Sequence, residues 1–275
     1  MEKTRPYSEK ILITGGTSGL GLELAKLYLK KGYHVVALGR RSVQTDFHGG
    51  RFDIYNVDFT DLSHTAEEIK KILKTHTFRT VINNAAVIGP SRYCMTVNGF
   101  ELTFQVNFLS HLLVNEILIR TLCNHRPLKI IAVTSPVHRI IDPEKLFSCF
   151  EEPGYSPLKA YSASKLCLII MCSFLAERYP DPDFKFISYS PGVFSSGIFR
   201  MQQPFLRGLY KLAAPFMKSP ASEADEMLKI IGQNYLTNGY VYFRGKKQPG
   251  EVKISKALCD AFMEDCYRTI EDFLL

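Results

Sequence analysis

The sequence has no uninterrupted run of about 18 apolar residues, so it indicates no segment that would span a membrane. It also has no low-complexity linker and no repeat at a solenoid period, which excludes repeat architectures. Residues 1–10 are polar and lack the apolar core of a secretory signal. We therefore expect a soluble protein that is located in the cytoplasm.

Concentrated positive charge is missing as well. The formal net charge is +7, yet no run of five or more Lys and Arg residues occurs, and the basic residues are interspersed with acidic ones. Such mixing is typical of an ordinary solvated surface, and no basic segment interleaved with aromatic residues points to a nucleic-acid site. We expect no nucleic-acid partner.

The cysteines and histidines show no spacing that is typical of a disulfide framework or a metal site. The seven cysteines are odd in number and include no Cys-x-x-Cys pair, which indicates reduced thiols. His111 and His138 have no partner at metal-ligand spacing, so we interpret both as structural residues. No metal site is predicted.

Segments with strand and helix patterns alternate along the chain. The strand segments are continuous apolar runs, a pattern typical of a parallel sheet that helices cover on both faces. We predict an α/β fold with a doubly wound, Rossmann-type parallel sheet, formed by residues 1–275 as a single domain. The strands are expected at 10–14, 34–39, 52–57, 80–83, 129–134, 184–190 and 240–243, and the helices at 20–31, 62–73, 98–123, 161–179, 221–234 and 255–275.

A glycine-rich turn follows the first predicted strand. Gly15, Gly19 and Gly21 lie between that strand and the first predicted helix. Glycine lets the backbone approach a pyrophosphate closely, and the helix N-terminus adds a partial positive charge. The turn therefore predicts a dinucleotide-binding site. The alternative is a tight turn that needs glycine only for its backbone conformation.

The second predicted strand ends in Gly39-Arg40-Arg41. Arg40 lies 19 residues beyond Gly21, where dinucleotide-binding folds contact the adenosine ribose. An acidic residue there would bind the 2′-hydroxyl, whereas an arginine forms a bidentate pair with a 2′-phosphate. We predict that the cofactor is NADP(H) in preference to NAD(H), with an ordinary surface arginine as the alternative.

Tyr161 and Lys165 are four residues apart, so both side chains project from one face if this segment is helical. A free phenol has a pKa of about 10, which makes it a poor proton donor and acceptor at neutral pH. A neighbouring ammonium group favours the phenolate and lowers that pKa. The pair indicates an acid/base catalyst, although the same spacing is common in exposed pairs on helix surfaces.

Together these segments resemble the short-chain dehydrogenase/reductase family in its compact form. The matching segments run in the family's order from residue 10 to about residue 197. They are Thr14-x-x-x-x-Gly19-x-Gly21, Val57-Asp58, Asn83-Asn-Ala-Ala86, Asn107, Ser135, Tyr161 with Lys165, and Pro191-Gly192. Within the family the chain looks most like the retinol dehydrogenase-like branch, on the basis of Thr134-Ser135-Pro-Val-His138 and Ala160-Tyr-Ser-Ala-Ser-Lys-Leu166.

The resemblance implies hydride transfer between nicotinamide and a carbonyl carbon. Tyr161 would exchange a proton with the carbonyl oxygen, and Ser135 would hydrogen-bond the same oxygen. Lys165 would lower the pKa of the phenol and bind the nicotinamide ribose, and Asn107 would position a water that leads protons to Lys165. The residues expected to bind the cofactor are Gly15, Thr17, Ser18, Gly19, Leu20, Gly21, Arg40, Asp58, Asn84, Ala85, Tyr161, Lys165, Pro191, Gly192, Val193 and Ser196.

Three residues depart from the family pattern. Ala86 replaces the usual glycine and adds only a methyl group. Ser18 is not basic, so the preference for NADP(H) depends on Arg40 alone. Ser196 replaces the usual threonine that holds the nicotinamide amide, but its hydroxyl is expected to keep that contact.

Residues 193–218 are expected to form a lid over the active site. The segment is rich in aromatic and aliphatic residues, which predicts a lipophilic carbonyl or alcohol substrate. Basic residues interleave with these apolar residues, so two interpretations remain. The lid packs on its own core, or it makes peripheral contact with a membrane. The last helix, about 255–275, is expected to pack on its own domain. A dimer contact is the alternative, so a homo-oligomer stays open too.

Two other function classes remain as alternatives. One is a non-catalytic NADP(H)-binding regulatory protein on the same fold, which the presence of Asn107, Ser135, Tyr161 and Lys165 disfavours. The other is a sugar-nucleotide epimerase, which would need a larger C-terminal substrate region and a different glycine spacing.

Overall fold

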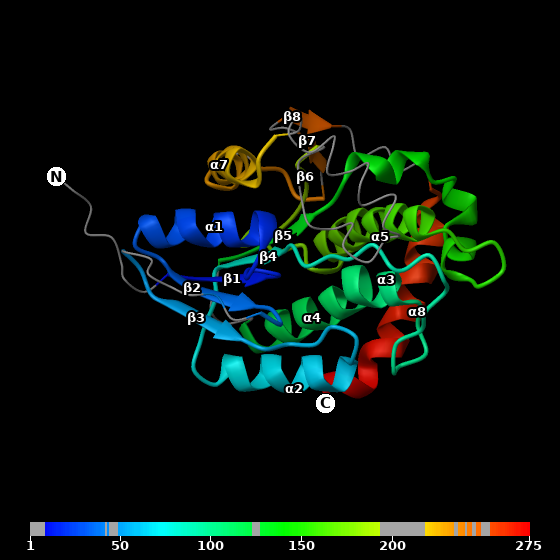
Figure 1. Cartoon of the computed structure of the whole chain (residues 1–275), viewed down its shortest axis with the longest axis horizontal. Helices are drawn as coiled ribbons and strands as arrows, with labels where there is room; N and C mark the ends of the chain where they lie inside the picture. Colours follow the sequence, from blue (N-terminus) through cyan, green and yellow to red (C-terminus); the bar gives the residue numbers. More distant parts are fainter. Residues whose placement is uncertain are drawn as a thin grey trace.

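Figure 1 shows the computed structural model of the chain. It describes residues 9–41, 43, 49–122, 127–192, 218–233, 236–239, 241–243, 246–248 and 254–275. The predicted lid lies outside these residues except for Lys218, and so do two predicted cofactor residues, Val193 and Ser196.

The described strands form an eight-stranded sheet in the order β3-β2-β1-β4-β5-β6-β7-β8. All neighbouring strands are parallel except the last pair, β7 and β8. The predicted doubly wound parallel sheet is therefore confirmed, with one antiparallel edge strand that we did not predict because it is three residues long and polar. The strands are β1 Lys10–Thr14, β2 His34–Leu38, β3 Phe52–Tyr55, β4 Thr80–Asn83, β5 Leu128–Val133, β6 Phe184–Ser190, β7 Val241–Phe243 and β8 Lys246–Gln248.

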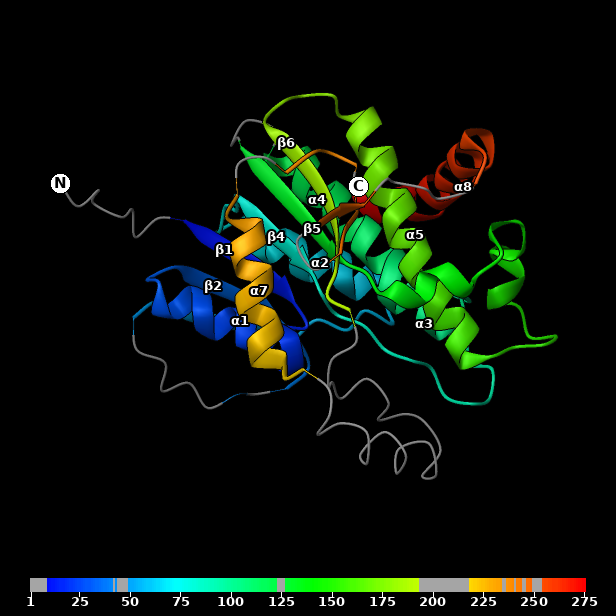
Figure 2. The same ribbon diagram turned by 90° about the horizontal axis from the view of Figure 1, so that it is seen from above.

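Helices cover both faces of the sheet, as Figures 1 and 2 show. Helices α1 (Gly19–Lys30) and α7 (Pro220–Ile231) lie on one face, and α2 (Leu62–Leu73), α4 (Ser110–Leu122) and α5 (Pro157–Arg178) on the other. Consecutive residues of a strand point to opposite faces, so Ile11 and Ile13 pack in one hydrophobic cluster and Leu12 packs in the other. Burial on both sides explains why the strands are continuous apolar runs.

The strand order places a topological switch point at β1. Its neighbours are β2 on one side and β4 on the other, so the connections that follow β1 and β3 run in opposite directions across the sheet. Open α/β sheets bind ligands outside the carboxyl ends of their strands at such a point. The glycine-rich turn follows the carboxyl end of β1 and leads directly into α1.

The predicted helix at 98–123 differs from the observed one. Residues Leu102–Phe104 form α3, a π-helical turn η1 covers Gln105–Leu109, and α4 follows. The helix begins only at Leu102 because the Glu101 carboxylate caps it, accepting a 2.7 Å hydrogen bond from the Phe104 amide. The π-turn contains Asn107, and such turns occur frequently at functional sites.

Helix α5 begins at Pro157, earlier than the predicted Tyr161. Proline is favoured in the first helical turn because it needs no hydrogen-bond donor there. Three 3₁₀ turns occupy the segment between β5 and α5, namely η2 Pro136–Ile140, η3 Pro143–Lys145 and η4 Phe147–Phe150.

The C-terminal helix α8, Lys256–Leu274, packs against α2, α4 and α5. Glu116 on α4 is fully buried and accepts hydrogen bonds from the hydroxyls of Tyr179, at 3.0 Å, and of Tyr267 on α8. The rings of Phe262 on α8 and Phe108 stack with centroids 5.4 Å apart. These contacts join α8 to the helices that cover one face of the sheet.

Two helical segments, Leu102–Leu122 and Pro157–Arg178, are long and apolar enough to cross a membrane by length and composition alone. Polar residues interrupt both segments, so neither is an uninterrupted apolar run. Their most apolar windows are 89% and 72% buried inside the fold, as is also found for core helices of soluble proteins.

Candidate active site

The four predicted catalytic residues come from three neighbouring segments of the fold. Asn107 lies in the π-turn, Ser135 follows the carboxyl end of β5, and Tyr161 and Lys165 lie on α5. Lys165 Nζ lies 5.6 Å from the centroid of the Tyr161 ring, and the Ser135 side chain lies close enough to the phenol to lower its pKa. The structure thus brings Ser135, Tyr161 and Lys165 together.

The protonation of the Tyr161–Lys165 pair differs from the sequence-based expectation. Burial raises the pKa of Tyr161, and the nearby Ser135 side chain only partly opposes this rise. Burial also lowers the pKa of Lys165 to about 7. The expected lowering of the phenol pKa by Lys165 is therefore wrong for this structure, because removal from water dominates at both groups.

Lys165 is 2% exposed, and its ammonium group donates a hydrogen bond of 2.8 Å to the carbonyl oxygen of Val133 at the end of β5. That carbonyl holds the amine at the end of the sheet, so the helix spacing alone does not determine where the charge lies.

The Asn107 side chain holds the segment after β4 against α5. Its carbonyl oxygen accepts a 2.8 Å hydrogen bond from Val87 N, and its amide nitrogen donates to Val87 O at 2.9 Å. The same nitrogen donates to Ser164 Oγ at 3.0 Å, and Ser164 lies on α5 beside Lys165. All of these partners are protein groups, so the side chain links the segment after β4 to α5.

The glycine-rich turn has room for a ligand at one glycine and none at another. Gly19 has φ +55°, and a Cβ added there would meet nothing within 4 Å. A Cβ at Gly21 would lie 2.4 Å from Gly15 O and 2.5 Å from Asn84 Nδ2. Gly21 is therefore required by packing inside the turn, whereas Gly19 leaves an open face where the backbone conformation disfavours other residues.

The N-terminus of α1 is suited to an anionic group. The Ser18 side chain makes no capping hydrogen bond, and no acidic residue occurs in the first turn. In α2, α7 and α8, by contrast, a side chain caps the first amides. Free amides and a partial positive charge are what a pyrophosphate needs.

The other predicted cofactor residues lie near the carboxyl ends of β1, β2, β3, β4 and β6. Arg40 is exposed just beyond β2. Asp58 accepts hydrogen bonds from the amide and hydroxyl of Thr60, at 3.0 and 2.9 Å. Leu20 is buried, so only its main chain is available to a ligand. Thr17 and Ala85 flank the glycine-rich turn, and Pro191 and Gly192 follow β6.

Thr14 was expected only as part of the glycine-rich motif, without a role of its own, and His111 was expected to be structural. Thr14 Oγ1 accepts hydrogen bonds from the amides of Asn84 and Ala85, at 2.8 and 2.9 Å, and lies 2.8 Å from His111 Nε2. The position of His111 one helical turn after Asn107 was the available signal, but its contact with Thr14 spans 97 residues and is visible only in the fold.

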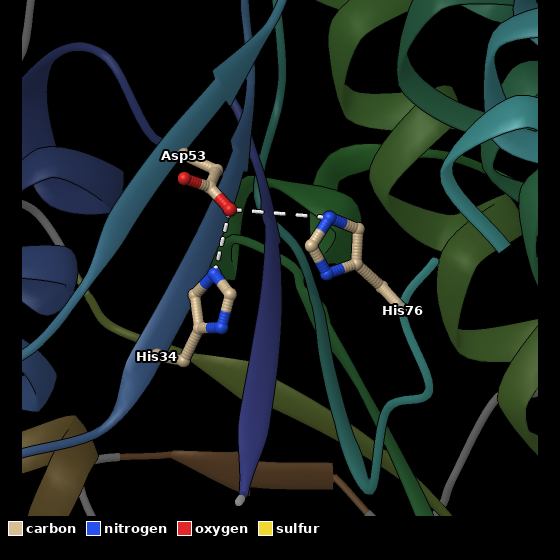
Figure 3. A group of neighbouring side chains, drawn as sticks. All are labelled: His34, Asp53 and His76. Atoms are coloured by element: carbon tan, nitrogen blue, oxygen red, sulfur yellow. Dashed lines mark hydrogen bonds and ion pairs between the residues drawn. The ribbon is translucent and has the colours of Figure 1, made fainter. Parts of the chain in front are cut away.

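A second polar cluster, which the sequence analysis missed, lies at the opposite, amino end of the strands. Figure 3 shows that His34 on β2, Asp53 on β3 and His76 before β4 point toward one another, and their ligand atoms lie within 4.8 Å of one another. His34 Nε2 is 2.7 Å from Asp53 Oδ2. Both ring nitrogens of His76 already have partners, Lys10 Nζ at 3.0 Å and the Tyr55 hydroxyl at 2.8 Å. A metal ion at this cluster would have to displace the Tyr55 contact.

The doubly wound sheet, the glycine-rich turn and the Tyr161–Lys165 pair define a dinucleotide-binding α/β protein, and comparison with known proteins identifies its family. The family model of the short chain dehydrogenases matches residues 9–205, more than half of the chain. The chain therefore belongs to the short-chain dehydrogenase/reductase family.

Two curated relatives illustrate the sequence similarity. The WW domain-containing oxidoreductase of Gallus gallus is 31% identical over 229 residues, which cover 76% of this chain and 54% of that protein. Human Retinol dehydrogenase 11 is 26% identical over 248 residues, which cover 84% and 77%. The chain spans about half the length of the WW domain-containing oxidoreductases that it matches. These similarities show the family, and they indicate the branch only weakly.

Solved structures with low sequence identity show the same fold. The 3-oxoacyl-[acyl-carrier protein] reductase from Brucella melitensis, in complex with NAD, has a TM-score of 0.66 at 17% identity, covering 90% of this chain and 98% of that chain. The NADPH-dependent 3-quinuclidinone reductase from Rhodotorula rubra has a TM-score of 0.63 at 20% identity, covering 88% and 96%.

Proposed function

We propose that the chain is an NADP(H)-dependent oxidoreductase that transfers hydride between nicotinamide and a lipophilic carbonyl or alcohol. One observation carries the proposal. The Tyr161 phenol, which lies near the Ser135 side chain and beside Lys165, is at the same end of the sheet as the glycine-rich turn. A proton donor and a dinucleotide site at one edge of the sheet are what carbonyl reduction requires.

The residues present fit a dinucleotide. Gly19 leaves open space in the turn, and the first turn of α1 has neither a capping side chain nor an acidic residue. Exposed Arg40 at the end of β2 supports NADP(H), because its guanidinium group can pair with a 2′-phosphate. Structural neighbours include complexes with NAD and with NADP, so the choice between the two rests on Arg40.

The chain's own groups would handle the proton and the charge. Nicotinamide, when bound, supplies or accepts the hydride. Tyr161 donates its phenolic proton to the carbonyl oxygen during reduction, and its raised pKa keeps it in the proton-carrying form at neutral pH. Ser135 orients the phenol and hydrogen-bonds the same substrate oxygen. Lys165 would bind the nicotinamide ribose, and in its ammonium form it would stabilise a developing phenolate.

The substrate class is supported by the sequence of the segment after β6 and by one relative. Residues 193–218 are rich in aromatic and aliphatic side chains, which suit an apolar substrate. The similarity to Retinol dehydrogenase 11, whose name denotes a lipophilic alcohol, agrees with this choice.

The test measures turnover of a panel of substrates by the change in NADPH absorbance. The panel contains long-chain and ring aldehydes and ketones, together with matched short, polar sugars. We expect turnover of the apolar members, and Tyr161→Phe should lower kcat by roughly 10²- to 10⁴-fold while NADPH binding persists. Tyr33→Phe, at the turn between α1 and β2, is the matched control and should turn over normally. Preference for the sugars would refute the substrate class, and unchanged turnover of Tyr161→Phe would refute the mechanism.

A further inference from the structure

His111 is a buried side chain to which the proposed reaction assigns no role. It is 0% exposed and lies on α4, one turn after Asn107. Its Nδ1 is 2.9 Å from the main-chain carbonyl oxygen of Asn107, and its Nε2 is 2.8 Å from Thr14 Oγ1. Both ring nitrogens therefore contact groups of the candidate active site.

The partners of the imidazole determine where its proton lies. The Asn107 carbonyl oxygen can only accept, so Nδ1 carries the proton and donates it. Thr14 Oγ1 already accepts hydrogen bonds from the amides of Asn84 and Ala85. Its own hydrogen is therefore left to donate, and Nε2 at 2.8 Å is the nearest acceptor. The imidazole is neutral, with Nδ1 as donor and Nε2 as acceptor.

The surroundings of His111 hold it in this neutral form. Burial lowers the pKa of His111 to about 4, the hydrogen bond to Asn107 opposes the shift, and the positive charge of Lys165 adds to it. No carboxylate is among the groups that shift this pKa. Phe59 covers the imidazole, with ring centroids 5.5 Å apart.

The hydrogen bonds of His111 connect the cofactor side of the site with the catalytic helix. Thr14 ends β1 and anchors the amides of Asn84 and Ala85, which lie against the glycine-rich turn. From His111 the connection passes to Asn107, whose side chain donates to Ser164 Oγ on α5. Ser164 lies on the helix that carries the proton donor and the buried amine.

We propose that His111 is a positioning residue for hydride transfer, which holds the Asn107 carbonyl and keeps α5 in register with the glycine-rich turn. The proposal rests on the proposed function. A displacement of about 1 Å between reacting groups can reduce a rate by roughly 100-fold, so loss of this connection should lower kcat more than it weakens cofactor binding.

The experiment compares two substitutions at the same site. His111→Gln keeps a donor for Asn107 O and an acceptor for the Thr14 hydroxyl, whereas His111→Leu removes both and is close in size. The measurements are NADPH affinity by fluorescence titration, single-turnover hydride transfer on the best substrate of the panel, and melting temperature. We expect His111→Leu to lower the transfer rate by roughly 10- to 100-fold, and His111→Gln to restore most of it.

Substitutions of Thr14 test the same connection from its other end. They remain informative if His111→Leu fails to fold. Thr14→Val should reduce the transfer rate, and Thr14→Ser, which keeps the hydroxyl, should not. In the double variant His111→Leu/Thr14→Val the losses should be less than additive, because both changes break the Thr14–His111 contact, whereas the loss of the amide hydrogen bonds to Thr14 is the same with and without His111. Equal losses in His111→Leu and His111→Gln, or full additivity, would overturn the proposal.

The tautomer can be checked without any substrate. The ¹⁵N shifts of His111 should show a neutral, Nδ1-protonated ring between about pH 5 and pH 9. An Nε2-protonated ring, or titration in that range, would overturn the proposal. If the wild type turns over the panel and His111→Leu has the same transfer rate, only the positioning role of His111 is refuted. A wild type that binds NADPH but turns over nothing refutes the proposed function and this role with it.

Discussion

Lys165 Nζ donates a 2.8 Å hydrogen bond to the main-chain carbonyl oxygen of Val133, the last residue of β5. The amine is buried under α5, and burial lowers its pKa to about 7. Among the described residues, Lys165 is the one cation beside Tyr161, and the end of β5 fixes its position. Its charge changes near neutral pH.

The first prediction concerns the pH dependence of stability. The unfolded chain holds the Lys165 proton up to about pH 10.5, whereas the folded protein releases it at about pH 7. The free energy of unfolding should therefore rise with pH across this window, by about 1.4 kcal/mol per pH unit from this group, and the gain should be lost as the pH falls toward 7. Lys165→Met should remove that slope in urea titrations at a series of pH values. Lys159→Met, an exposed lysine of the same helix, should keep it.

The second prediction concerns cofactor choice. Arg40→Asp should raise the dissociation constant of NADPH by roughly 10- to 100-fold, because it replaces a charge-assisted hydrogen bond with a repulsive contact. NADH, which lacks the 2′-phosphate, should bind nearly as before. Fluorescence titration of both cofactors measures the difference. Arg268→Asp, the same change on exposed α8, should affect neither, and equal losses for the two cofactors in Arg40→Asp would contradict the assignment.

The third prediction separates backbone strain from ligand contact. Gly19 is the first residue of α1, and Gly32 follows the end of this helix. Both have positive φ, and a Cβ added at either would meet nothing within 4 Å. Gly19→Ala and Gly32→Ala should each lose roughly 1 kcal/mol of stability from the strained conformation. Only Gly19→Ala should also weaken NADPH binding, by roughly tenfold, because its methyl group enters the space proposed for the pyrophosphate. Similar NADPH affinities of the two variants would contradict the placement of the cofactor.

The fourth prediction concerns the cluster at the amino end of the sheet. Burial by itself raises the pKa of Asp53, but hydrogen bonds from Arg51 and His34 outweigh it and lower the pKa below its usual value. The carboxylate should therefore stabilise the fold above the unfolded pKa of about 3.9, and this contribution should be lost as the pH falls through the lowered value. Asp53→Asn should cost about 1 kcal/mol at neutral pH and much less in acid.

Chemical denaturation at neutral and at acid pH provides the measurement for Asp53→Asn. Asp272→Asn, at an exposed site on α8, is the control and should change stability little at either pH. A loss of stability for Asp53→Asn that is the same at both pH values would mean that its charge is not involved.

The fold and the family could be predicted from the sequence because the signals are local. Buried strands such as His34–Leu38 are read directly as apolar runs, and the glycines of the first turn stand next to the strand that they end. The confirmed parallel sheet follows from such runs alternating with helices. The roles of Tyr161, Lys165, Ser135 and Asn107 stay predictions, although the spacing of the first two is explained by one face of a helix.

Sequence by itself determined which residue types are available for the chemistry and the order in which strands and helices present them. Only the tertiary structure decided that Thr14 meets His111, that the Asn107 side chain is taken up by Val87 and Ser164, and that burial dominates the pKa values of Tyr161 and Lys165. The physical reason is that propensity and periodicity act over a few neighbouring residues, whereas desolvation and hydrogen bonding depend on groups that folding brings together from distant parts of the chain.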